Sequence, residues 1–145
     1  MIKLSAFTLV EMLLVVAVMG VIAGFSAPVI RLSQISNNLD LATLTTSQAV
    51  KRAQLLSMAA MEDDGWGLHT STSSLIIFKG ADFVNRDVVF DEVWDMPEGT
   101  SATSTNNIVF NKTRGNCINP GQVFVSSVNN ATEIININSK GTAEY

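Results

Sequence analysis

The apolar run from Phe7 to Ile30 constrains this chain more than any other feature of its sequence. The only polar side chains in the run are Thr8, Glu11 and Ser26, and Glu11 carries its only charge. A helix of this length would extend about 36 Å, enough to cross the hydrocarbon core of a bilayer. Because an ionisable side chain is costly in such a segment, Glu11 points to a functional role.

Two simpler interpretations account for part of this pattern. A secretory signal also begins with a short basic region, here Lys3, but its apolar stretch contains no acid and ends at a small-residue cleavage site. In this chain the apolar run continues to Ile30, and the small residues Ser5 and Ala6 precede it. A plain membrane anchor explains the length of the run but gives no reason for a carboxylate at Glu11.

The motif AFTLVE at residues 6–11, followed by a long apolar helix, resembles the processing site of type IV prepilins and pseudopilins. The resemblance implies that a prepilin peptidase removes the leader 1–6 by cutting between Ala6 and Phe7, and methylates the new amine of Phe7. It also implies that the helix assembles with other pilins or pseudopilins, with the help of an assembly platform protein of the membrane. The motif departs from the family at Ala6, where the family usually has Gly.

The position of Glu11 fits this resemblance. After cleavage, the Phe7 amine would be a cation in the first helical turn, four residues before the carboxylate. Opposite charges attract strongly at low dielectric constant, and an unpaired charge there is costly. Glu11 is therefore a candidate assembly residue that pairs with the amine of a neighbouring subunit. Pairing with the amine of its own chain is the alternative.

Gly20, Gly24 and Pro28 are spaced four residues apart in the same run. An interior glycine weakens a helix by about 1 kcal/mol and an interior proline by about 3 kcal/mol. These residues therefore predict a soft or bent stretch. Gly20 and Gly24 also form a small-xxx-small face that lets two helices approach closely. Softening and close packing are both open, and they do not exclude each other.

Length and charge bound the rest of the chain. Its 145 residues leave room for one apolar helix and one soluble domain of about a hundred residues. The formal charge is −4, and loss of Lys3 would leave 8 basic against 13 acidic side chains, or −5. Nucleic acid is therefore not an expected partner. The single Cys117 excludes an internal disulfide, and we expect it to be buried.

After Pro28 the sequence keeps a helical period and becomes amphipathic over residues 31–62. The residues of the predicted stripe are Leu32, Ile35, Leu39, Ala42, Thr46, Ala49, Ala53, Leu56 and Ala60. They recur three or four positions apart, as one face of a helix does. Because the stripe is rich in Ala, we expect a sheet to pack closely on it, with a thin coiled-coil seam as the alternative.

Residues 63–145 indicate a β-rich globular head. Trp66–Thr70 and Leu75–Lys79 flank a polar turn and predict a hairpin. Further strands are expected at Val88–Trp94, Asn107–Asn111, Gln122–Ser127 and Glu133–Asn138.

The predicted fold class is therefore α+β. A long helix, membrane-spanning over residues 7–30 and amphipathic over 31–62, packs against a small, mostly antiparallel sheet. The order of these elements is similar to that of minor pseudopilins of the GspH/FimT type.

No enzyme is predicted. His69 is the only histidine, which excludes a multi-histidine metal site, and we expect no catalytic triad around it. The acids around one predicted strand are Asp82, Asp87, Asp91, Glu92, Asp95 and Glu98. They lack the spacing of an EF-hand, and a solvated acidic face is favoured over a calcium site. We expect no catalytic residue, no metal and no cofactor.

The expected function is that of a structural subunit, a minor pilin or pseudopilin of a type IV pilus or type II secretion pseudopilus. Before assembly it would lie in inner-membrane lipid as a single-pass protein with its head outside the cytoplasm, and afterwards in a periplasmic or extracellular filament. The alternative is a pilus-tip receptor or adhesin, including a DNA-uptake minor pilin, for which Lys112, Arg114 and Lys140 are the sparse basic residues. A plain membrane-anchored domain is less favoured.

Overall fold

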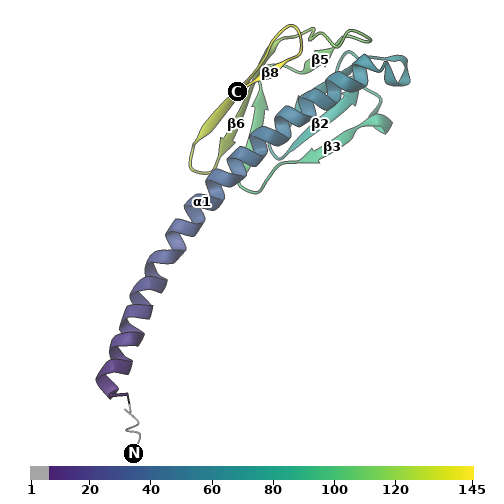
Figure 1. The fold of residues 1–145 in the computed structure, drawn as a ribbon. Coiled ribbons are helices and arrows are strands. Elements are labelled where there is room, and N and C mark those ends of the chain that lie inside the picture. The colour runs from purple at the N-terminus through teal and green to yellow at the C-terminus, as the bar shows by residue number, and fades with distance from the viewer. Residues whose placement is uncertain (1–6) are drawn as a thin grey trace, which may run out of the picture. The chain divides into compact units, whose positions relative to one another are not determined.

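The computed structural model describes residues 7–145, except for the side chains of residues 25–30. Over these residues the elements are one α-helix, α1 (Leu9–Met58), two 3-10 turns and eight strands (Figure 1). The chain divides within α1 into two units, Met1–Gln34 and Ile35–Tyr145. The second unit contains all the strands.

The first unit corrects the prediction of a membrane-spanning helix over residues 7–30. Among the residues that the structure describes, no helix combines the length and the apolarity needed to cross a membrane. The apolar stretch of α1 with described side chains covers residues 9–24. The predicted membrane-spanning half of the helix is therefore wrong, and the predicted single-pass inner-membrane location is wrong with it.

In the second unit, α1 buries one stripe of small and apolar side chains. The predicted stripe is buried at each of its positions from Leu39 to Leu56, whereas Leu32 is 64% exposed. The helix ends at Met58, four residues before the predicted end at Glu62. It ends there because Ala60 adopts a left-handed conformation (φ 49°), after which the 3-10 turn η1 (Met61–Asp63) begins.

The strands form two antiparallel sheets of four strands, where the sequence predicted one small sheet. The first has the order β3-β2-β1-β5, with β3 (Glu92–Asp95), β2 (Ser74–Lys79), β1 (Trp66–Thr70) and β5 (Ile108–Phe110). The second has the order β4-β6-β7-β8, with β4 (Thr100–Ser104), β6 (Gly121–Ser127), β7 (Thr132–Ile137) and β8 (Ala143–Glu144). The predicted hairpin is confirmed, because β1 and β2 pair from Trp66 with Lys79 to Thr70 with Leu75.

One core joins the helix to both sheets. Figure 1 shows this part of α1 running between β6 on one side and β2 and β3 on the other. Side chains of α1 such as Ala49 share a single buried cluster with Ile77 of the first sheet and Val123 of the second. The Ala-rich stripe leaves room for the strands to come close to the helix.

The predicted strand Val88–Trp94 is wrong in its first half. Residues Val88–Phe90 form a second 3-10 turn, η2, and within the predicted range only Glu92, Val93 and Trp94 belong to β3. The turn begins at Asp87, whose carboxylate accepts a hydrogen bond from the Val89 N–H (3.2 Å). This local bond gives the backbone a partner other than a neighbouring strand.

Candidate functional site

Residues 7–24 expose a nearly continuous apolar surface. Phe7 and Leu9 are each 75% exposed. Of the large apolar side chains described between residues 7 and 24, none is buried. Soluble monomers rarely expose a contiguous apolar patch of this kind to water. Such a patch therefore marks an interaction site.

Glu11 lies in the first turn of α1, where Thr8 caps the helix. The Glu11 N–H donates to the Thr8 carbonyl oxygen (3.1 Å) and lies 3.3 Å from Thr8 Oγ1. The spacing Thr-x-x-Glu is that of a capping box, a local reason for an acid here that the sequence analysis missed. None of the ion pairs among the described residues involves the exposed Glu11 carboxylate. The carboxylate is therefore open to a cation from outside the chain.

The remaining predicted site residues differ in how far the structure describes them. Ala6 and the rest of the leader lie outside the described residues, and the cleavage after Ala6 stays a prediction. Gly20 and Gly24 both lie in α1, and a Cβ built at either would meet no atom within 4 Å. The backbone remains helical through Pro28, whose side chain is not described. The packing and softening roles of these residues stay predictions.

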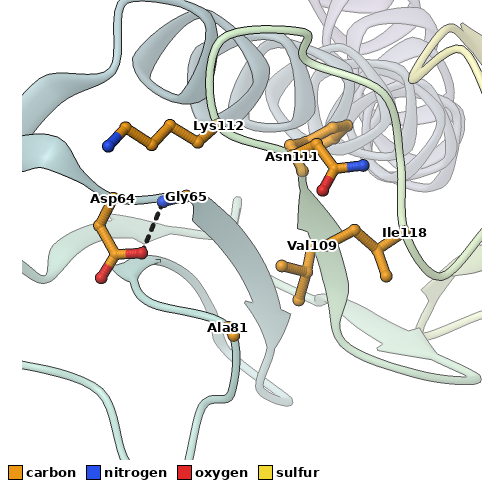
Figure 2. Close-up of a pocket in the computed structure, with 8 residues that line it drawn as sticks. Asp64, Gly65, Ala81, Val109, Asn111, Lys112 and Ile118 are labelled. Atoms are coloured by element: carbon orange, nitrogen blue, oxygen red, sulfur yellow. Dashed lines mark hydrogen bonds between the residues drawn. The ribbon is translucent and has the colours of Figure 1, made fainter.

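The second unit contains a small pocket between η1, β5 and the segment after β2 (Figure 2). Its volume is about 190 Å³, below the roughly 300–1,000 Å³ of most ligand sites. Its lining residues are Asp64, Gly65, Ala81, Val109, Phe110, Asn111, Lys112 and Ile118.

The charged groups of this pocket already have partners inside the molecule. Asp64 accepts a hydrogen bond from the Gly65 N–H (2.7 Å). The Lys112 ammonium pairs with Asp63 and lowers the pKa of that carboxyl through a hydrogen bond and charge attraction. The pocket therefore offers little to a polar ligand, and Lys112 is not a free cation for nucleic acid.

A stack of three side chains holds the segment between β2 and β3. The half-buried His69 ring stacks on Phe83 with ring centroids 3.7 Å apart, and His69 Nδ1 lies 2.7 Å from Asn107 Oδ1. The Arg86 guanidinium carbon lies 3.7 Å from the centre of the Phe83 ring. His69, the only histidine of the chain, is thus engaged in packing and in a contact with Asn107.

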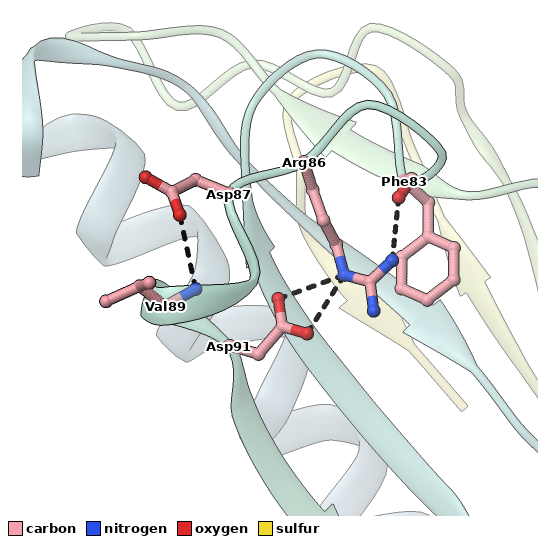
Figure 3. Close-up of polar contacts among 5 residues, drawn as sticks. All are labelled: Phe83, Arg86, Asp87, Val89 and Asp91. Atoms are coloured by element: carbon pink, nitrogen blue, oxygen red, sulfur yellow. Dashed lines mark hydrogen bonds and ion pairs between the residues drawn. The ribbon is translucent and has the colours of Figure 1, made fainter.

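Polar contacts fix the same segment from within (Figure 3). Arg86 Nε lies 3.0 and 2.9 Å from the two carboxylate oxygens of Asp91, and Arg86 Nη1 donates to the Phe83 carbonyl oxygen (2.9 Å). The side chains of this pair are only 20% and 14% exposed. Yet Val84 and Val89 are each 82% exposed. We call residues 82–91 the valine loop.

The acids near β3 do not converge on a common point. Asp91 pairs with Arg86, and Glu92 pairs with Arg52 of α1 (2.9 Å). Within the described part of the chain, no group of three or more His, Cys, Asp or Glu residues is arranged to hold a metal ion.

Cys117 is buried, as the sequence predicts, with 6% of its surface exposed. Burial raises the pKa of its thiol by disfavouring the thiolate. A thiol of this kind is a poor nucleophile at neutral pH.

Comparison with protein-family models, with curated proteins and with solved structures finds no match to this chain. No relative therefore supports the predicted assignment to pilins or to a secretion system, and the resemblance at residues 6–11 stays a prediction.

Proposed function

We propose that this chain is a structural subunit that assembles, through the start of α1, into a filament of the type IV pilus or secretion-pseudopilus kind. The observation that carries the proposal is the exposure of apolar side chains all around the helix. Met12, Leu13, Leu14, Val15 and Val16 are consecutive, and each is at least 40% exposed. Successive residues of a helix point about 100° apart, so these five cover its whole circumference. A helix that is apolar all round is normally buried.

A bundle of like helices meets this requirement on every side. Burying one Val, Leu or Met side chain contributes roughly 1.5–3 kcal/mol, so five contribute about 10 kcal/mol. Association itself costs about 4–15 kcal/mol. A single partner helix covers only part of the circumference and therefore gains only part of this burial free energy. Several neighbours around each helix favour an extended bundle over a pair.

Glu11 supplies what apolar packing lacks, a defined axial position. Apolar helices can slide along one another at small cost, whereas a charge buried without a counterion is strongly destabilised. If the leader is removed, the cation nearest in height to Glu11 is the new amine at Phe7. Pairing of Glu11 with the Phe7 amine of a neighbour therefore selects one register.

The processing step is tested by intact-mass and N-terminal peptide analysis of the chain, produced with and without a prepilin peptidase. We expect loss of residues 1–6 and a methyl group on Phe7 only when the peptidase is present. An intact Met1 under both conditions would overturn the processing step.

The assembly step is tested with Glu11→Gln, which keeps the size of the side chain and removes its charge. Glu62→Gln is the matched control, because it removes the same charge in the second unit. Electron microscopy should show filaments for the control and at least about tenfold fewer for Glu11→Gln, the effect of about 1.4 kcal/mol per subunit addition. Equal filament yields for the two variants would contradict the role of Glu11.

A further inference from the structure

The valine loop exposes apolar side chains on a backbone that is held in place by contacts within the loop. Val84, Val88 and Val89 are 82%, 64% and 82% exposed. The Arg86–Asp91 pair and the stack on Phe83 hold the backbone that carries them. An ordered loop that keeps its valines in solvent loses little conformational entropy when a partner covers it.

The same unit carries a second exposed apolar surface on α1. The exposed residues Leu41, Leu44, Gln48, Lys51, Leu55 and Met58 follow one another at intervals of three and four. They form one stripe along the helix, which we call the outer stripe. Its four large apolar members are between 47% and 60% exposed. The outer stripe does not take part in the core, which is built on the other residues of the helix.

The two surfaces have opposite charges. Asp82 and Asp87 lie in the valine loop, and neither belongs to an ion pair within residues 7–145 as described. Lys51 lies in the middle of the outer stripe and is likewise unpaired there, whereas the adjacent Arg52 is engaged with Glu92. An exposed cation among leucines complements exposed acids among valines in both charge and apolarity.

We propose that the valine loop of one copy docks on the outer stripe of a second copy of this chain. One chain supplies both halves of the contact, so the two halves are always present in equal amounts. The loop and the stripe are different surfaces, which makes the contact heterologous unless a two-fold axis relates the copies. The inference rests on residues 35–145 alone and goes beyond the proposed assembly through residues 7–24.

A photo-crosslinker placed in the loop tests this contact directly. The full-length chain carrying Val89→benzoylphenylalanine is mixed in a non-ionic detergent with an isotope-labelled copy and irradiated. Mass spectrometry should then find crosslinks from residue 89 to residues 41–58 of the labelled copy. The same probe in Val128→benzoylphenylalanine, an exposed position outside the loop, should give none. Crosslinks confined to a single copy, or equal yields for the two probes, would overturn the proposal.

Charge reversal then tests the complementarity. Asp82→Lys and Lys51→Glu should each lower the yield between copies about fivefold, the effect expected for losing an exposed ion pair. The double variant should restore the yield, because it exchanges the two charges. Asp95→Lys is the matched control, since it makes the same charge change at an exposed residue of β3. A double variant no better than the single ones would contradict the pairing.

The proposed assembly through residues 7–24 and the proposed contact between loop and stripe can be refuted independently. Glu11→Gln should reduce filaments and leave the crosslink between loop and stripe unchanged, because the contact lies in the second unit. Asp82→Lys should reduce the crosslink and leave processing at Phe7 unchanged. Loss of the crosslink in Glu11→Gln would show that the contact is not formed by the second unit itself.

Discussion

Replacing Ser57 with Ala removes a single oxygen atom, but it should destabilise the second unit strongly because that oxygen contacts several buried backbone groups. Ser57 is fully buried near the end of α1. Its Oγ accepts a hydrogen bond from the Trp66 N–H (2.7 Å) at the start of β1. The same hydroxyl lies 3.3 Å from the Trp66 carbonyl oxygen and 3.5 Å from that of Phe110 in β5. One side chain thus links the helix to two strands.

The cost follows from what the substitution leaves behind. The Trp66 N–H would lose this acceptor in a place that water does not reach, since Trp66 is only 4% exposed. A buried donor without a partner costs about 1–3 kcal/mol, and we take about 2 kcal/mol for Ser57→Ala. For a unit of about 110 residues, a loss of that size lowers the Tm by about 8 °C.

The matched control is Thr46→Val in the same helix. Thr46 is also fully buried, but its Oγ1 donates only to the Ala42 carbonyl oxygen (2.8 Å), which already accepts a bond within the helix. We expect Thr46→Val to change the free energy of unfolding by less than about 0.5 kcal/mol, because no buried group loses its only partner. Both variants are unfolded with urea and followed by circular dichroism. A loss for Ser57→Ala no larger than that for Thr46→Val would refute the reasoning.

Three further predictions concern packing, the thiol and acid stability. Gly67→Ala should lower the free energy of unfolding by about 3 kcal/mol in a urea titration, because its Cβ would lie 2.5 Å from the ring of the fully buried Phe78. Cys117 should react with a thiol reagent in urea much faster than in the folded protein, and equal rates would contradict its burial and raised pKa. Lys112 lowers the pKa of Asp63 below 3.8, so their pair contributes stability above that pH, and the contribution is lost as the pH falls through the lowered pKa. Asp63→Asn should therefore make acid unfolding slightly less steep, by a small amount because the pair is exposed.

The elements that sequence predicted well are those with a clear period. The hairpin and the buried stripe of α1 depend on apolar residues at regular spacing, and both are present. Strand β4 escaped prediction because its sequence TSATS has a single buried apolar residue, Ala102. Its register is set by pairing with β6, a contact between distant parts of the chain that cannot be predicted from the local pattern of apolar residues.

The valine loop shows the opposite error. Val88, Val89 and Phe90 resemble the start of a core strand by composition, and only the 3-10 turn and the exposure of the two valines reveal another arrangement. The available signal was Asp87, because an aspartate two residues before a backbone N–H often bonds to it and starts a turn. In the same way, the motif at residues 6–11 predicted a role for Glu11 but concealed the capping by Thr8.

Gln54 has a consequence for the order in which this chain can fold. Its side-chain amide donates to the carbonyl oxygens of Gly115 and Lys140, each at 2.9 Å, which lie 61 and 86 residues further along the chain. Contacts at such separation close large loops, and their entropy cost must be met before any bond is gained. Both bonds therefore form only after the two loops have reached α1. Gln54 therefore ties α1 to the last turn of the chain, and its two bonds can form only once loops of 61 and 86 residues have closed.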